Sequence, residues 1–168
     1  IDVGRQLFVD DFLVERLEGI ERIYPKPVKY AGNPVLKPET QLELNDGDRN
    51  ACALPKGGGI WWDPEDRLFK LWYEAGWINT ICYATSSNGV DWVRPILNVH
   101  GENNQVLPPD MLPDSWSVVP DFDHPDRSQR WKMFLRGPGM DLPGYVLTSP
   151  DGIHWDNRRL TGKSLDRS

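Results

Sequence analysis

The feature that most constrains the fold of this chain is a short sequence that occurs twice. The segment SSNGVDW spans Ser86 to Trp92, and SPDGIHW spans Ser149 to Trp155, 63 residues later. Asn-Gly and Asp-Gly are the preferred central pairs of a two-residue type I′ turn, because both positions of that turn require a positive φ. We therefore predict that each copy forms the turn of a β-hairpin.

The similarity extends towards the N-terminus of each copy, so that a whole unit is repeated. RLFKLWYE, residues 67–74, aligns with QRWKMFLR, residues 129–136, and Lys70 then matches Lys132. Each unit reads as a strand, an Asp/Pro turn, a strand, a Gly-containing loop, a strand, an Asn/Asp-Gly turn and a Trp-bearing strand. Four short antiparallel strands in about 60 residues are typical of one blade of a β-propeller.

The repeat predicts an all-β chain that forms a single partial propeller domain over residues 1–168. Its predicted parts are an N-terminal segment and loop over residues 1–50, a first blade over 58–94, a connecting loop over 95–116 and a second blade over 117–159. Because propellers close with about four to eight blades, and about two are present, we expect the chain to be a fragment of a longer propeller. The alternative is a ring completed by a second copy, since an open ring exposes strand edges that favour self-association.

Composition excludes several classes of partner. A net charge of −6 and a pI near 5.0, without a basic stripe, argue against nucleic acid. The sequence lacks the apolar run of about 18 residues that a membrane span needs. Its three histidines lie in different loops without the spacing of a zinc site, and it has no Gly-rich phosphate loop, so we expect neither a metal nor a cofactor. Cys52 and Cys82 are compatible with a disulfide, or with Cys82 as a small core residue.

Several segments resemble the five-bladed β-propeller superfamily of glycoside hydrolase families 32 and 43. They are NPVLKP (33–38), WWDPEDRLFKLWYEAG (61–76), CYATSSNGVDW (82–92), NNQVL (103–107) and YVLTSPDGIHW (145–155). The likeness extends to poorly characterised bacterial members that open with a segment like LFVDD, residues 7–11. The resemblance implies a secreted or periplasmic bacterial protein with a funnel at the propeller axis, where acidic residues at the first strand of each blade act on a carbohydrate.

Candidate catalytic residues follow from that resemblance. Glycoside hydrolysis needs one carboxyl group to protonate the leaving oxygen and another to activate water or attack directly. The Asp-Pro pattern typical of family 43 fails here, because Gly57 and Ser115 occupy the expected acid positions. The neighbouring Asp114 and the loop residues Asp46 and Asp48 are the remaining candidates. Each is alternatively a turn cap or a solvated charge.

Four further residues are candidates for substrate binding. Trp77 and Trp116 are expected in connecting segments, outside the repeat, where an aromatic face can stack on a sugar ring. Glu74 and Arg136 occupy equivalent positions after the second strand of each unit, where they can hydrogen-bond a sugar or remain charges at a wet rim.

Three functions are therefore compatible with the sequence. The leading hypothesis is a glycoside hydrolase of the family 32 and 43 kind, which acts on a glycosidic bond with paired carboxylates and whose active site is incomplete in this fragment. The alternative is a non-catalytic propeller that binds carbohydrate or protein, which the missing Asp-Pro pattern favours. A third is a scaffold domain whose acidic surface keeps it in solution.

Overall fold

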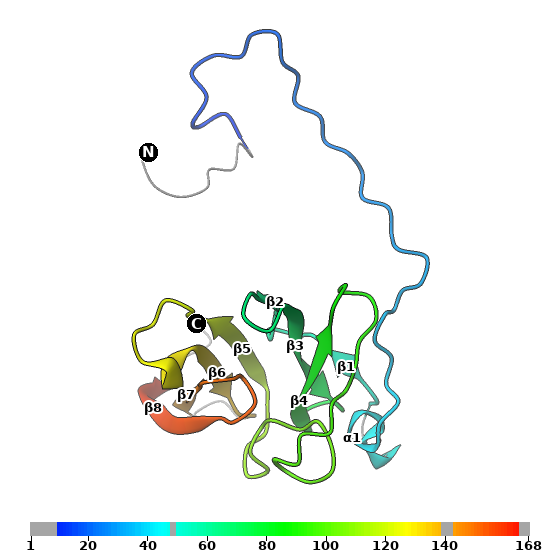
Figure 1. Ribbon diagram of the computed structural model, residues 1–168, viewed down its shortest axis with the longest axis vertical. Helices are drawn as coiled ribbons and strands as arrows, with labels where there is room; N and C mark the ends of the chain where they lie inside the picture. The colour runs from blue at the N-terminus through cyan, green and yellow to red at the C-terminus, as the bar shows by residue number, and fades with distance from the viewer. Residues whose placement is uncertain (1–9, 48–49, 139–142, 165–168) are drawn as a thin grey trace. The chain divides into compact units, whose positions relative to one another are not determined.

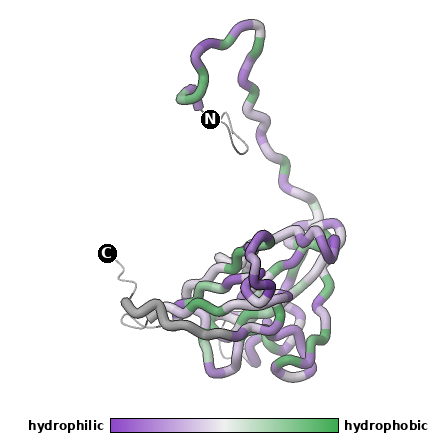
Figure 2. The backbone as a smooth tube through the Cα atoms, turned by 60° about the vertical axis from the view of Figure 1, so that its left-hand side comes forward, coloured by the Kyte–Doolittle hydropathy of each residue, from purple (hydrophilic) through white to green (hydrophobic). Residues whose placement is uncertain are grey.

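The computed structural model describes residues 10–47, 50–138 and 143–164 of the chain. Contacts divide the chain into two compact units, residues 1–31 and residues 32–168. Between residues 10 and 31 the backbone forms neither helix nor strand and carries hydrophilic and hydrophobic residues along its length (Figure 2). Its large apolar side chains, such as Phe12 and Val28, are largely exposed. The described hydrophobic core therefore belongs to the second unit.

The second unit contains two four-stranded antiparallel sheets, seen in Figure 1. The first sheet consists of β1 (Ala53–Leu54), β2 (Ile60–Asp63), β3 (Leu68–Ala75) and β4 (Thr80–Ser86). The second sheet consists of β5 (Ser115–Pro120), β6 (Trp131–Arg136), β7 (Pro143–Ser149) and β8 (Asp156–Ser164). The helical elements are α1 (Gln41–Leu44) and the 3-10 turns η1 (Asn45–Gly47) and η2 (Arg127–Gln129). Two antiparallel sheets with one short α-helix agree with the all-β prediction.

Pairing in the two sheets matches over three strand positions, except that the first strand of the first sheet is interrupted. The counterpart of β8 in the first sheet is only the isolated bridge between Thr85 and Val93. In the second sheet β5 pairs continuously with β6. In the first sheet β1 pairs with the end of β3 and β2 with its beginning, while β4 occupies the other edge of β3. β1 and β2 are thus two halves of one edge strand, separated by residues 55–59.

The repeated hairpins exist, but they are longer than a two-residue turn. Thr85 pairs with Val93, and Thr148 pairs with Asp156, so the loop in each copy is the whole repeated segment. Because equivalent residues pair in both copies, 63 residues apart, the two copies form the same kind of hairpin.

The type I′ assignment of these turns is wrong. Gly89 and Gly152 have φ values of 74° and 81°, but Asn88 and Asp151 do not have positive φ. Side-chain oxygens organise the loop instead, because Ser86 Oγ accepts hydrogen bonds from two following backbone N–H groups, at 3.2 and 2.8 Å. The second copy repeats this arrangement.

The two sheets pack face to face through large aromatic side chains. Trp72 and Trp131 are fully buried, with ring centroids 4.7 Å apart. The indole N–H of Trp72 donates to the carbonyl of Gly152 at 2.7 Å, and that of Trp61 donates to the carbonyl of Val118 at 2.8 Å. Burial of each aromatic removes on the order of 150–250 Å² from water, so this interface supplies much of the stability of the unit.

The opposite face of the first sheet is covered by the segment that precedes it. Leu36 and Leu42 pack on a second apolar cluster that contains Tyr73. Glu43 of α1 is fully buried, where it accepts from the Tyr73 hydroxyl at 2.6 Å and from Arg94 Nε at 2.7 Å. Burial alone would raise the pKa of Glu43, but the hydrogen bonds, led by that of Arg94, lower it below its ordinary value.

The bounds of the observed strands differ from the predicted bounds of the two blades and the connecting loop. β1 precedes the predicted start of the first blade at residue 58, and β5 begins within the range predicted for the connecting loop. That connection is an ordered crossover, because Val106 and Leu107 are fully buried in the core between the sheets. β8 continues past residue 159 to Ser164.

Candidate functional site

The charged residues matched by the repeat, Glu74 and Arg136, lie at the same end of the two sheets. Glu74 is paired with Leu54 of β1, and Arg136 with Ser115 of β5. Four of the candidates from sequence, together with one lysine, meet at this end. We call them the strand-end cluster: Lys56, Glu74, Trp77, Asp114 and Arg136.

One ion pair in each sheet, and one hydrogen bond between the sheets, connect the cluster. Lys56 Nζ lies 3.2 Å from Glu74 Oε2 and donates a hydrogen bond to the backbone carbonyl of Asp114. Arg136 Nη1 donates to Asp114 Oδ2 at 3.0 Å. The backbone N–H of Asp114 also donates to the carbonyl of Arg136, at 3.0 Å. Lys56 therefore contacts both sheets.

Burial divides the cluster into supporting groups and accessible groups. The side chains of Glu74 and Arg136 are 0% and 6% exposed, whereas those of Asp114 and Lys56 are 21% and 30% exposed. Buried charges persist only when they are paired, so the first two require their partners. A ligand can therefore reach Asp114 and Lys56, but not Glu74 in this conformation.

Trp77 adds an exposed aromatic ring to the cluster. It is 42% exposed, and Lys56 Nζ lies 5.1 Å from the ring centroid, within the range of a cation–π contact. Gly76 directly before it has a φ of 71°, and a Cβ there would lie 2.7 Å from the carbonyl oxygen of Leu42. The preceding helix thus packs against the backbone that presents Trp77.

A shallow hollow of about 270 Å³ adjoins Arg136 on the second sheet. Its lining comes from β5, β6 and β7: Ser115, Trp116, Ser117, Phe134, Leu135, Arg136, Gly144 and Tyr145. Phe134 at its floor is 46% exposed. The hollow provides an apolar surface beside the Asp114–Arg136 pair.

The surroundings of Glu74 include a thiol. Glu74 Oε1 accepts from the backbone N–H of Ile78 at 2.7 Å, and the Cys52 thiol lies 3.7 Å from the Glu74 carbonyl oxygen. Burial, followed by the charge of Glu74, raises the pKa of the Cys52 thiol. Cys52 and Cys82 are both free, so the disulfide alternative is not realised.

The other predicted site residues do not join the cluster. Asp46 lies exposed in η1, with a φ of 48°, and Asp48 lies outside the described residues. Trp116 lies in β5 rather than in a connecting segment, and it is only 6% exposed in the core between the sheets. Its ring is therefore not free to stack on a sugar.

The absence of an acid at residue 57 has a steric reason. A Cβ on Gly57 would lie 2.0 Å from the backbone oxygen of Trp116, and one on Gly58 would lie 2.2 Å from the Trp116 ring. The two glycines let the chain between β1 and β2 approach β5 directly. No side chain of any kind fits at residue 57 without moving this contact.

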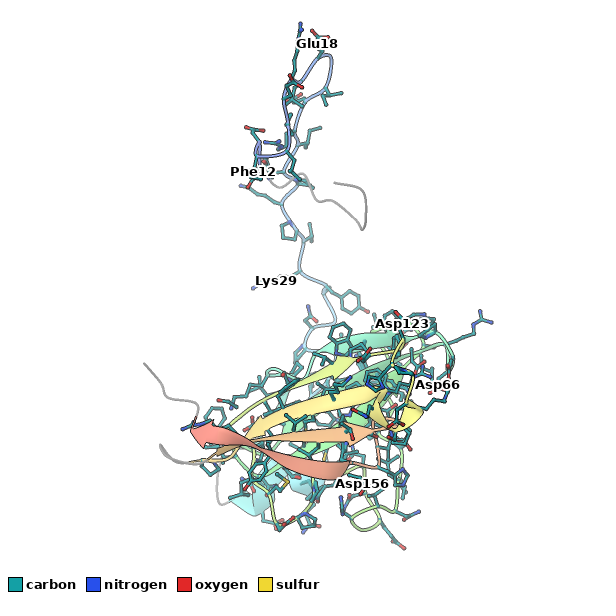
Figure 3. All side chains as sticks on the ribbon, turned by 90° about the vertical axis from the view of Figure 1, so that its left-hand side faces the viewer. Phe12, Glu18, Lys29, Asp66, Asp123 and Asp156 are labelled. Carbon is teal, nitrogen blue, oxygen red and sulfur yellow. The ribbon has the colours of Figure 1, made fainter. Side chains whose placement is uncertain are left out.

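A second charged network lies at the opposite end of the strands. Asp63 is buried and accepts from Lys70 Nζ and from Arg130 Nη2, both at 2.8 Å. Burial alone would raise the pKa of Asp63, but the hydrogen bond from Lys70 and the other donors outweigh it and lower the pKa. Asp66 and Asp123, labelled in Figure 3, mark this end of the two sheets. Because the network joins both sheets and its centre is closed to solvent, we assign it a structural role.

Lys56 is the cluster residue that sequence reasoning missed. Five residues, 55–59, separate the paired residues Leu54 and Ile60, where only two separate Ser115 and Val118 in the second sheet. This difference in length between the repeats is the signal that marks Lys56.

Comparisons with known proteins do not assign the chain to a family. No protein-family model matches the chain, and searches of curated proteins and of solved structures found no significant match. Within residues 10–47, 50–138 and 143–164, no helix has the length and apolar character to cross a bilayer. Among the same described residues, no group of three or more His, Cys, Asp and Glu side chains is arranged to hold a metal ion.

Proposed function

We propose that this chain is part of a five-bladed β-propeller of the glycoside hydrolase family 32 and 43 kind, and that it acts on a glycosidic bond at the strand-end cluster. The observation that carries the proposal is that Lys56 contacts both Asp114, whose carboxylate is accessible, and the exposed indole of Trp77. A carbohydrate ligand and a periplasmic or extracellular site of action belong to the same proposal.

The propeller architecture is supported by the way in which the two sheets stack. One face of the first sheet, with Lys70 and Trp72, is covered by the second sheet. The matching face of the second sheet carries Lys132 and Phe134, and Phe134 is 46% exposed. A further sheet on that face would repeat the observed interface and continue the stack around an axis.

The proposed chemistry assigns different tasks to the cluster residues. Asp114 supplies one of the two carboxyl groups, and its partly exposed oxygen can activate water or attack the anomeric carbon. Trp77 provides a surface on which a sugar ring can stack. The second carboxyl group, which protonates the leaving oxygen, comes from a residue outside the cluster, because Glu74 is fully buried.

A non-catalytic binding propeller is the second candidate. It is favoured by Gly57, where the backbone of Trp116 leaves no room for an acid, and by the engagement of Asp114 with Arg136. In that case Trp77 and Lys56 recognise a glycan, and the Asp114–Arg136 pair only holds the start of β5 against the end of β6.

Hydrolysis of a panel of aryl glycosides and plant or bacterial glycans separates the two candidates, measured with the complete propeller of which we propose this chain to be part. As a hydrolase, Asp114→Asn should lower turnover by roughly 100-fold or more, the loss expected for a positioned acid or base. Asp46→Asn, at an exposed position outside the cluster, is the matched control and should change little. Glycan binding without turnover, abolished by Trp77→Ala but kept in Asp114→Asn, would favour the binding propeller; neither binding nor turnover would refute both.

A further inference from the structure

Lys56 occupies a position that neither sheet alone would explain. Its ammonium contacts the Glu74 carboxylate of the first sheet, the Asp114 carbonyl at the start of the second sheet, and the Trp77 ring. Among the described residues, it is the one cation within ion-pair distance of Glu74. One side chain thus joins the backbone of Asp114, the exposed indole of Trp77 and the buried acid Glu74.

The backbone that carries Lys56 is built for this contact. The five-residue segment 55–59 bulges from the edge strand of the first sheet, where the second sheet has two residues. Gly57 and Gly58 bring that segment against Trp116, close enough that a Cβ on either would collide. The segment is therefore fixed against β5, and the Lys56 side chain starts from a defined place.

The charge of Glu74 explains why a lysine is needed there. A fully buried carboxylate is costly unless it is paired, and the Lys56 ammonium pairs with Glu74 Oε2 at 3.2 Å through charge, since that oxygen accepts no hydrogen bond. The Ile78 N–H fixes the other carboxylate oxygen of Glu74 at 2.7 Å. Glu74 consequently acts as an anchor that aims Lys56 at Asp114 and Trp77.

We infer that Lys56 is the positioning residue of the strand-end cluster: it fixes the backbone of Asp114 relative to the ring of Trp77, and so sets the geometry in which a sugar is bound. The inference rests on the proposed function for the identity of the ligand. It extends that function by naming the residue that sets the geometry of the site, because Lys56 contacts Glu74, the backbone of Asp114 and the ring of Trp77. Glu74 supports Lys56 and does not itself touch the ligand.

The test compares the NMR resonances of backbone amides and tryptophan indoles in the wild-type chain with those of the Lys56→Met, Lys56→Arg and Lys132→Met variants. The Ser115 amide shares its peptide group with the Asp114 carbonyl, so it reports the Lys56 hydrogen bond directly. We expect Lys56→Met to shift the Ser115 amide and Trp77 indole signals, and Lys56→Arg to restore them in part. Lys132→Met removes the lysine of the Asp121–Lys132 ion pair, away from the cluster, and should leave both signals unchanged.

Glycan binding by the same variants completes the test. Lys56→Met should weaken binding by roughly tenfold, the loss expected for one charge-assisted hydrogen bond, with partial rescue in Lys56→Arg. Unshifted Ser115 and Trp77 signals, or wild-type glycan affinity in Lys56→Met, would overturn the inference. If the signals shift but the wild-type chain binds no glycan, the proposed function fails, while the coupling of Asp114 to Trp77 through Lys56 stands.

Discussion

The two sheets carry the same Asp–Lys pair in two different environments. Asp63 and Lys70 of the first sheet are 2% and 4% exposed, whereas Asp121 and Lys132 of the second sheet are 41% and 22% exposed. The residues and the register are equivalent, so the difference lies in what covers them. The second sheet covers the first pair and adds Arg130 to it. The same Asp–Lys pattern therefore forms a buried ion pair in one repeat and a surface ion pair in the other.

The same comparison extends to the aromatic position next to the lysine. Trp72 is fully buried, and its indole N–H donates to the loop of the second sheet, whereas Phe134 at the matching position is 46% exposed. Phenylalanine has no donor to leave unsatisfied, which suits a face without a described neighbour. If coverage by a second sheet determines how much each matched residue contributes to the free energy of unfolding, substitutions at matched positions should have different effects.

The largest difference is expected between Trp72→Ala and Phe134→Ala. Removal of the buried indole should cost about 4 kcal/mol of unfolding free energy, since it leaves a cavity and an unpaired carbonyl. The Phe134 ring is half exposed, so its removal should cost about 1 kcal/mol or less. Urea denaturation of both variants measures this, and equal losses would show that the stacked interface is not the core of the fold.

The next difference concerns the lysines. Lys70→Met should destabilise the chain by about 3 kcal/mol, because Asp63 then remains buried with fewer partners. Lys132→Met should leave the midpoint of urea denaturation almost unchanged, because Asp121 is open to water. A similar loss in the two variants would contradict the role assigned to the second sheet.

A smaller difference separates the glycines of the repeated loops. Gly89 and Gly152 both have positive φ, but a Cβ at Gly152 would lie 2.4 Å from the Trp72 ring, while at Gly89 the nearest atoms are 4.0 Å away. Gly152→Ala should therefore cost about 2 kcal/mol more than Gly89→Ala, which only strains the backbone. Equal melting temperatures would indicate that the loop of the second sheet does not press on Trp72.

The smallest effect is a pH dependence. It should be larger for the buried Asp63 than for Asp121, whose pKa the hydrogen bond from Lys132 also lowers but which is open to water. The pKa of Asp63 is lowered from its ordinary value of 3.8, so its contribution to stability is present above that pH and is lost as the pH falls through the folded-state pKa. Asp63→Asn should flatten the fall in stability below about pH 4. Denaturation at several acid pH values tests this, and an unchanged slope in Asp63→Asn would assign the acid sensitivity to other carboxylates.

Sequence reasoning predicted the architecture of the repeat better than its loops. Lys70 and Lys132 were matched correctly because strand pairing preserves their spacing, and the all-β content followed from the same repeat. The turn type failed because Ser86 Oγ accepts from the loop backbone, a side-chain contact that the Asn-Gly pair alone does not reveal. Trp116 was misplaced because β5 begins inside a Pro-rich connection.

The candidate site was predicted in part for similar reasons. Glu74 and Arg136 were found through their equivalent positions, and Asp114 through a one-residue shift from Ser115. The convergence of these residues on Lys56 depends on the packing of one sheet against the other, which spacing along the chain does not encode. A lysine in a Gly-rich bulge has no pattern of its own, so only the unequal length of the two repeats indicates it.

The most direct test of the account is a titration of the isotope-labelled chain with the oligosaccharides of the glycan panel, followed by amide and indole resonances. We predict that the Ser115 amide and the Trp77 indole shift with a common saturation curve, while amides at the opposite strand ends, near Asp66 and Asp126, do not change. Shifts confined to those opposite ends, or none with any glycan, would contradict the claim that the two repeats meet to form a carbohydrate site at the strand-end cluster.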